Sequence, residues 1–320
     1  MEDVGAPDFK SIALHFLYCH VLFMIAALCG LSIIVGPFLY PGTVGLFLTL
    51  PYLSYIFFVR LELKSGSPWP WFSQNFFVLN HLRRTLQLAF VDFPPHASTQ
   101  QYLYACHPHG VYSDYRMLID GMFGQQHVGA VSPKTLAATI LFRLPFIREL
   151  SLWTGCIDAR RQVAEESLQR GESVFVLPGG EAEQIRTKYG REIVYLKNRK
   201  GFIKLAIRKG VPVVPMYAFG VSDYYYTSDM LLGPRLWLTK TLQICIPFAI
   251  GLGGSPFCPL PQKTTVVFGD PLTFEPSACR ESPTAEELDA AHGKFLDSLT
   301  KLFDAHKDRL GYGDRNLEIL

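Results

Sequence analysis

The chain has 320 residues, 49% of them hydrophobic, and a formal net charge of only +2. This length allows one large or two modest domains, and the apolar content is high for a wholly soluble protein. The seven cysteines are scattered without a CxxC pair, so the sequence indicates neither a disulfide framework nor a zinc ribbon, and it is typical of a reducing compartment.

The apolar residues are concentrated near the N-terminus. No Lys, Arg, Asp or Glu occurs between Lys10 and Arg60, and this stretch is long enough for two helical spans of about 20 residues each. We expect the spans at 12–35 and 42–60, joined by the turn-forming GPFLYPG into a hairpin that crosses the bilayer or re-enters it. A cleaved signal peptide is the alternative, and the acidic residues before the apolar run disfavour it.

The rest of the chain is expected on the cytosolic face, because cations follow the apolar region: Arg60, Lys64, Arg83 and Arg84. No linker, repeat or low-complexity tract divides this remainder. The sequence therefore predicts a membrane hairpin at 1–65 and one membrane-associated cytosolic domain at 66–320.

From residue 74 onward, strand and helix patterns alternate. The spacing of apolar residues predicts helices at 74–91, 113–123, 133–144, 161–172 and 200–210, and strands at 101–106, 127–132, 173–178 and 211–219. Such alternation is typical of an α/β domain with a largely parallel or mixed sheet flanked by helices. Functional residues in such sheets lie at the carboxyl ends of strands.

Two later segments carry less chemical information. The apolar segment 235–257 fits a second membrane contact, a wall of an acyl-chain tunnel or an ordinary buried helix. The segment 284–310 has a helical apolar stripe, which we interpret as packing only.

The sequence HPHG follows a predicted strand. Pro108 stiffens the backbone between His107 and His109, and Gly110 allows a sharp turn. A general base, a metal site and a structural turn are all open readings. A helix from 111 onward would bring Asp114 within reach of His109, where a carboxylate fixes the tautomer of the imidazole and raises its basicity. A metal lacks further ligands, because the other histidines form no HxxxH or HExxH pair.

Two more polar blocks follow. In PGGEAE (178–183), a strand runs into two glycines and then acids, which is typical of an ordinary turn or of an anion site built from backbone N–H groups. The segment 186–209 holds nine Lys and Arg residues although the whole chain has a net charge of +2. It is either a solvated helix face or a site for phosphates or anionic headgroups.

HPHG, PGGxxE and RKGFxxxAxxxGxxxVPxxxFG (199–220) occur in this order, and the chain thereby resembles the diacylglycerol acyltransferase type 2 family, which also includes monoacylglycerol and wax-alcohol acyltransferases. The resemblance covers nearly the whole chain. The chain is also similar to the wider glycerolipid acyltransferases in its His-x4-Asp spacing and in GCIDARR (155–161). One departure is Val221, where the family pattern has Glu. Any role of that Glu is therefore missing here, unless Asp223 substitutes for it.

The resemblance implies direct acyl transfer from a CoA thioester to a neutral-lipid hydroxyl, with diacylglycerol as the expected acceptor and no metal or redox cofactor. The implied catalytic residues are His109 as general base, Asp114 as its orienting acid, and His107 as support for the loop or the oxyanion. Glu181 or Glu183 would bind the acceptor's hydroxyls. The remaining implied substrate-binding residues are Pro108, Gly110, Gly179, Gly180, Arg199, Lys200, Gly201, Phe202 and Lys204.

Within this set, the N–H groups of Gly179 and Gly180 are candidates for the oxyanion or the acceptor. Arg199, Lys200 and Lys204 would hold the CoA phosphates. A covalent intermediate is disfavoured, because no Ser lies in a G-x-S-x-G elbow and Cys106 follows from a strand as a core residue.

The expected partners are acyl-CoA, a neutral lipid and the bilayer, with a homodimer as an open alternative to a monomer. Nucleic acid is excluded as a partner, since no fold motif for it occurs. The expected location is the endoplasmic reticulum membrane, with lipid droplets as a second site. The rival functions are a monoacylglycerol, wax-alcohol or lysophosphatidate acyltransferase and a non-enzymatic lipid-droplet hairpin protein.

Overall fold

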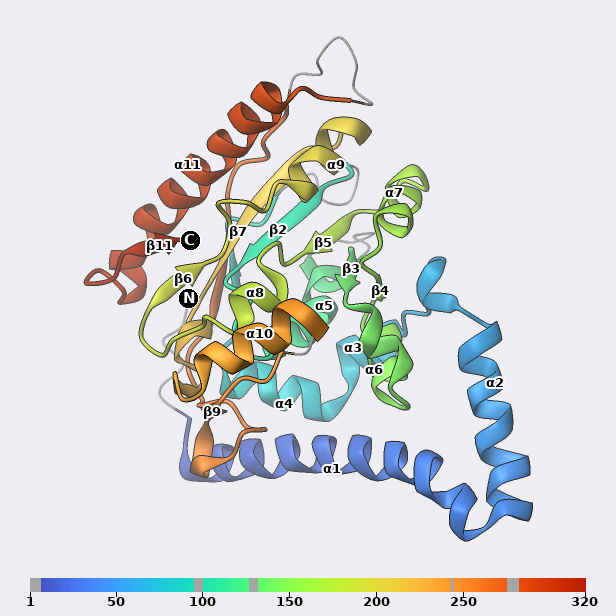
Figure 1. The fold of residues 1–320 in the computed structure, drawn as a ribbon. Coiled ribbons are helices and arrows are strands. Elements are labelled where there is room, and N and C mark those ends of the chain that lie inside the picture. The colour runs from blue at the N-terminus through green and yellow to red at the C-terminus, as the bar shows by residue number, and fades with distance from the viewer. Residues whose placement is uncertain (1–6, 95–99, 127–131, 243–244, 275–281) are drawn as a thin grey trace.

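A computed structural model describes residues 7–94, 100–126, 132–242, 245–274 and 282–320 (Figure 1). The α-helices are α1 Phe9–Leu39, α2 Leu50–Phe58, α3 Pro70–Asn75, α4 Phe77–Thr85, α5 Asp114–Gln126, α6 Ile147–Trp153, α7 Arg161–Gln169, α8 Gly180–Gln184, α9 Gly201–Lys209, α10 Leu232–Leu242 and α11 Ala285–Leu310. The strands are β1 Ala89–Val91, β2 Leu103–His107, β3 Lys134–Ala137, β4 Cys156–Asp158, β5 Val174–Val176, β6 Glu192–Val194, β7 Val213–Phe219, β8 Tyr226–Thr227, β9 Ala249–Ile250, β10 Thr265–Phe268 and β11 Leu317–Ile319.

A seven-stranded mixed sheet forms the centre of the domain. Its strand order is β1-β10-β7-β2-β5-β3-β4. Only the β10–β7 pair is antiparallel, whereas β2 pairs in parallel with both β7 and β5. The predicted α/β class with a largely parallel or mixed sheet is therefore confirmed, and β2 lies at the middle of the sheet.

Side chains alternate along β2 and enter two separate cores, as expected for a strand covered on both faces. Leu103 and Ala105 pack with residues of α7, α9 and α11, whereas Tyr104 and Cys106 pack with residues of α4 and α5. The domain is thus a three-layer sandwich of helices, sheet and helices, with α11 and α9 on one face (Figure 1). Its HPHG loop leaves from the carboxyl end of the central strand.

The N-terminal helices α1 and α2 lie in the segment that was predicted to form the hairpin. Figure 1 shows α1, in dark blue, running along one side of the domain, and α2 at a steep angle to α1 after a π-helical segment at Pro41–Thr49. The stretches Phe9–Leu39 and Gly42–Leu63 are each long and apolar enough to cross a membrane. The structure thus supports membrane association, while the choice between a full crossing and a re-entrant hairpin stays a prediction.

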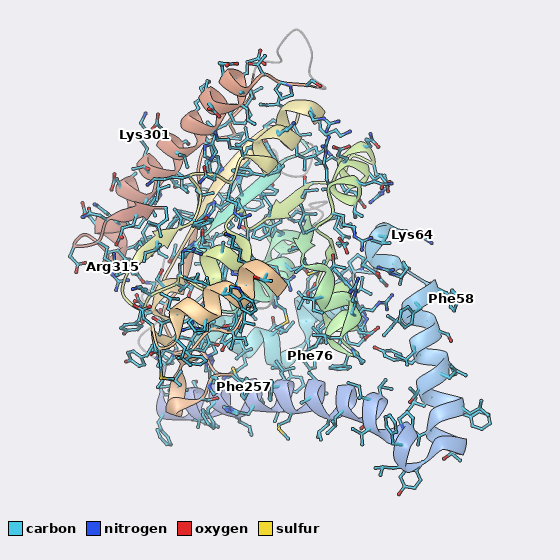
Figure 2. The ribbon with its side chains drawn as sticks, in the orientation of Figure 1. Phe58, Lys64, Phe76, Phe257, Lys301 and Arg315 are labelled. Carbon is cyan, nitrogen blue, oxygen red and sulfur yellow. The ribbon has the colours of Figure 1, made fainter. Side chains whose placement is uncertain are left out.

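One face of α1 is not free for lipid. His15, Cys19 and Ala26 are buried, and they lie at helical spacing on the side that faces the domain. Phe23 stacks on Phe257 with ring centroids 3.6 Å apart, and Figure 2 shows Phe257 beside α1. The opposite face is apolar and exposed, as at Leu28, so α1 joins the domain to an apolar environment.

Two local predictions were wrong, and a third is not tested. The segment 133–144 forms β3 and a 3-10 turn rather than a helix, because Lys134–Ala137 fills the gap between β4 and β5 in parallel register. The predicted helix 74–91 ends at Thr85 and continues into β1. The predicted strand 127–132 lies almost wholly outside the described residues.

The segment 235–257 is not a buried helix. On α10 only Arg235 is buried among the residues whose side chains the structure describes, and Trp237 is 61% exposed. Short-range apolar patterns did not distinguish this exposed helix from a core helix, since both have the same composition.

Candidate active site

The HPHG loop presents its two histidines to different surroundings. His107 is the last residue of β2 and is completely buried, following the alternation that places Leu103 and Ala105 on the α11 face. Its ring lies near Phe295 of α11, with centroids 6.2 Å apart. His109 comes two residues later, beyond the sheet edge, and lines a cavity. The pair is therefore divided between the core and a binding site.

Glu183 holds the loop from the core side. Its buried carboxylate accepts hydrogen bonds from the backbone N–H of His109 and, at 2.7 Å, of Tyr195, and it lies 3.6 Å from Nδ1 of His107. Burial opposes the charge of this carboxylate, but His107 and the two N–H groups hold its pKa below the ordinary value. Glu183 is therefore an ionised clamp behind the loop.

This position changes the role predicted for Glu183. Its side chain is fully enclosed, so it does not reach an acceptor hydroxyl in the cavity. The other candidate, Glu181, does line the cavity, and burial raises its pKa. Gly179 lies so close to Glu183 that an added Cβ would collide with the carboxylate. Glycine at this position makes room for the clamp.

The imidazole of His109 is held in one tautomer. Nδ1 lies 3.1 Å from the carbonyl of Gly110, and Oγ of Ser113 lies 3.0 Å from Nδ1 and 3.2 Å from Nε2. Because a carbonyl only accepts, Nδ1 carries the ring proton and Nε2 carries the lone pair. Burial lowers the pKa of His109 from its ordinary 6.5, so the ring is neutral at physiological pH. A neutral imidazole with a lone pair on Nε2 is able to accept a proton.

The orienting group is Ser113, not Asp114 as predicted. Ser113 adopts a left-handed φ of 55°, and its hydroxyl donates to the carbonyl of His109 at 2.9 Å. With this backbone conformation at Ser113, the side chain of Asp114 does not contact His109. Its carboxylate accepts a hydrogen bond from Tyr225 at 2.8 Å. Burial raises the pKa of Asp114 to about 6. No hydrogen bond between Asp114 and His109 occurs in the described part of the chain.

The cavity beside His109 has a volume of about 870 Å³, which is within the range of ligand sites. Most of its wall is apolar. The apolar residues include Leu136 of β3, Ile140 of the following 3-10 turn and Val176 of β5. The predicted residues Gly180, Glu181, Gly201, Phe202 and Lys204 all line it. The second and third sequence blocks therefore meet the first at one site.

Cations border this apolar wall. Lys204 and Arg208 reach it from the same face of α9, one turn apart, and Arg116 and Arg161 reach it from α5 and α7. Arg161 and Arg208 share Glu165, with distances of 2.7 and 3.0 Å. Among the residues that the structure describes, Lys204 has no acidic partner. The cavity thus combines an apolar wall with a cation that is available to a phosphate.

The other two cations predicted for CoA lie elsewhere. Lys200 precedes α9 and pairs with Asp289 of α11. The guanidinium of Arg199 stacks over Tyr195, 5.4 Å from the ring centroid. Helical spacing explains the difference, because positions 201, 204, 205 and 208 share the cavity face of α9.

The glycines and the proline of the motifs are structural in part. A Cβ on Gly110, which has φ of 71°, would lie 2.7 Å from Val221. The carbonyl of Pro108 accepts the hydroxyl of Tyr115 at 2.8 Å. The N–H of Gly180 donates to the carbonyl of Leu177 at 3.1 Å, so it is not a free oxyanion donor. These residues shape the loop more than they offer groups to a ligand.

Val221 and Asp223 follow the family motif at the end of β7. Asp223 accepts from Arg315 at 2.9 Å, and Arg315 also donates to buried Glu192 at 2.8 Å. This cluster fastens the C-terminal strand β11 beside β6. Asp223 is thus part of a structural ion cluster, which does not support it as a replacement for the Glu that the family pattern has at position 221.

Sequence reasoning missed Ser113, Arg116 and Arg161. Arg161 ends the quoted block GCIDARR, so its position after β4 was a usable signal. Arg116 lies in the first turn of α5, and its guanidinium donates to the carbonyl of Thr154 at 2.9 Å. No short motif predicts this contact.

The sequence profile described as "Diacylglycerol acyltransferase" matches residues 38–320. The chain belongs to this acyltransferase family, which confirms the resemblance read from its motifs. It is 28% identical to human diacylglycerol O-acyltransferase 2 over 81% of this chain and 70% of the relative. It is 30% identical to human acyl-CoA wax alcohol acyltransferase 2 over 69% and 71%.

The chain is 31% identical to diacylglycerol O-acyltransferase 1 of Eremothecium gossypii over 71% of its length, and it spans about half of that relative, 52%. Among solved structures, the 1-acyl-sn-glycerophosphate acyltransferase PlsC of Thermotoga maritima aligns over 80% of this chain and 92% of its own. That alignment has a TM-score of 0.41 and 15% identity.

Proposed function

We propose that the protein is an acyl-CoA:diacylglycerol O-acyltransferase that forms triacylglycerol and free CoA. The observation that carries the proposal is the neutral imidazole of His109 on the wall of an apolar cavity of about 870 Å³. A long acyl chain needs such an apolar wall, and its transfer to an alcohol needs a base.

In the proposed reaction, Nε2 of His109 removes the proton of the acceptor hydroxyl as its oxygen attacks the thioester carbonyl. The new C–O ester bond forms, the C–S bond breaks, and the imidazolium returns the proton to the leaving CoA thiolate. The lowered pKa of His109 keeps the base unprotonated at neutral pH. The proton that leaves the acceptor hydroxyl ends on the CoA thiol and no electrons are transferred, so the reaction as proposed uses no metal or redox cofactor.

We assign the phosphates of CoA to the cationic end of the cavity. Lys204 is the principal contact, since the described residues give it no acidic partner, and Arg208 and Arg161 are already neutralised in part by Glu165. The acyl chain then lies along Leu136 and Ile140. Glu181, the acidic residue of the cavity lining, is the candidate contact for the glycerol end of the acceptor.

We place the enzyme in the endoplasmic reticulum membrane with its domain in the cytosol, and also on lipid droplets. The exposed apolar face of α1 and the cations Arg60 and Lys64 after the apolar region support this placement. Cleavage of the domain by protease added to intact microsomes tests its orientation. A homodimer stays a prediction.

A competition assay tests the acceptor. The purified protein receives one acyl-CoA together with diacylglycerol, monoacylglycerol, a fatty alcohol and lysophosphatidate. We expect the highest kcat/KM with diacylglycerol. A preference for the fatty alcohol would assign the protein to wax synthesis, whereas no transfer to any acceptor would reject the enzymatic function.

A further inference from the structure

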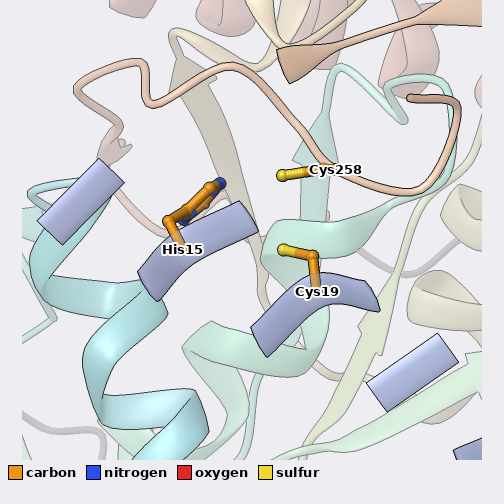
Figure 3. A group of neighbouring side chains, drawn as sticks. All are labelled: His15, Cys19 and Cys258. Carbon is orange, nitrogen blue, oxygen red and sulfur yellow. The ribbon is translucent and has the colours of Figure 1, made fainter. Parts of the chain in front are cut away.

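A cluster of metal-binding side chains lies outside the cavity, between α1 and the loop that follows β9. His15 and Cys19 are one helical turn apart on α1, and Cys258 comes from the loop. All three are buried, and one ligand atom from each lies within 4.8 Å of those from the other two. Figure 3 shows the imidazole and the two sulfurs converging on one point.

The imidazole of His15 is prepared for a ligand. Nε2 lies 3.0 Å from the carbonyl of Pro259, and Nδ1 is buried without a hydrogen-bond partner in the described part of the chain. A metal-binding histidine commonly has one nitrogen on the metal and the other bonded to a carbonyl or carboxylate. A buried polar atom without a partner carries a cost that a bound cation removes.

We propose that His15, Cys19 and Cys258 bind one divalent cation of the zinc class, which fastens α1 to the catalytic domain. Two thiolates and one imidazole are soft and borderline ligands, which select zinc over Mg²⁺ or Ca²⁺. Sulfurs around a tetrahedral zinc lie about 4 Å apart, given Zn–S bonds of about 2.3 Å. The cluster is close to this spacing, and three protein ligands leave the fourth position to water.

The position of the cluster explains what a cation would do. Neighbouring contacts of the same face, including His20 with Ser255 at 2.7 Å and Phe23 with Phe257, bring the same loop onto α1. The cation would therefore connect α1 to the loop that follows β9 in the domain.

The sequence contains the spacing His-x3-Cys at His15 and Cys19, which patterns of paired histidines such as HxxxH do not detect. On a helix, positions i and i+4 lie on one face. The third ligand is more than two hundred residues away in the chain and becomes apparent only from the fold.

The test measures metal in the full-length protein, purified in detergent with thiols kept reduced and without chelators. We expect about one zinc per chain by elemental analysis, and thiolate-to-metal charge-transfer absorption after replacement by Co²⁺. The variants Cys19→Ser and Cys258→Ser should both lose the zinc and the Co²⁺ band. Cys29→Ser is the matched control, since Cys29 is exposed on the same helix, and it should keep both.

Two results would overturn the proposal. One is a wild-type protein, grown in zinc-supplemented medium, that holds no zinc and gives no thiolate band with Co²⁺. The other is a Cys19–Cys258 disulfide found by mass spectrometry in the freshly isolated protein. Both are measured on the wild type, so neither depends on whether a variant folds, and neither bears on which acceptor the enzyme uses.

Discussion

On its cavity side the HPHG loop presents the imidazole of His109, whereas on its core side it presents His107 to the carboxylate of Glu183. His107 is the last residue of β2 and His109 lies two residues beyond it, yet His109 faces a ligand-sized space and His107 is completely enclosed. The difference shows that the motif combines a reactive group with its own support. Changes on the cavity side should remove activity, and changes on the core side should also remove stability.

The largest expected effect is that of His109→Ala. Loss of the base should lower kcat by about 10²- to 10⁴-fold, while the unfolding temperature changes little, because the ring lies at a cavity wall. Acyl transfer by the purified variant and its thermal unfolding are the two measurements.

Cys106→Ser is the matched control on the preceding strand. Burial raises the pKa of the Cys106 thiol to about 12, which opposes a nucleophilic role, so transfer should be largely intact. Near-normal activity of His109→Ala, or its loss in Cys106→Ser, would contradict the direct mechanism.

Glu183→Gln should have the next largest effect. Charge-assisted hydrogen bonds are worth about 1.5–3 kcal/mol, so kcat should fall by about 10- to 100-fold as the loop loosens. The carboxylate also raises the pKa of His109 electrostatically, so the acid limb of the rate profile should move to lower pH. A purely structural residue would leave that limb in place, and an unmoved limb would reject the electrostatic contribution.

His107→Ala should mainly affect stability. The change removes the imidazole 3.6 Å from a buried carboxylate, and we expect a loss of about 2 kcal/mol in the free energy of unfolding. The protein that remains folded should keep more activity than His109→Ala. If the two variants lost activity equally at equal folded fractions, the division between the cavity side and the core side would be wrong.

The smallest effect is expected for Lys204→Ala. The loss of one partly exposed cation is worth about 1 kcal/mol, which corresponds to a rise of about fivefold in KM for acyl-CoA. Lys188→Ala is the control, since Lys188 pairs with Asp229 outside the cavity lining. An equal rise in both variants would indicate general attraction of CoA rather than a contact in the cavity.

The sequence allowed the central strand, the HPHG loop and α9 to be predicted, because each combines regular apolar spacing with turn residues at its end. Gly210, for example, ends α9 with φ of 64°. Strand β3 was not predictable in the same way, since its conformation depends on pairing with β4 and β5.

The site was predicted in its residue types and less well in its contacts. Lys204 was found, whereas Lys200 lies four positions earlier and pairs with α11. The expected Asp114–His109 contact does not form, because Ser113 between them adopts a left-handed φ of 55°. No short sequence pattern predicts this angle. Contacts that depend on one turn conformation or on distant elements therefore need the fold.

The pH dependence of kcat/KM tests the central claim most directly, namely that His109 is the base. Because burial holds the pKa of His109 in the free enzyme below 6.5, kcat/KM should rise with pH, with a midpoint below 6.5, and become level at higher pH. The residual activity of His109→Gln should show no such rise. The same acid limb in wild type and His109→Gln would contradict the account.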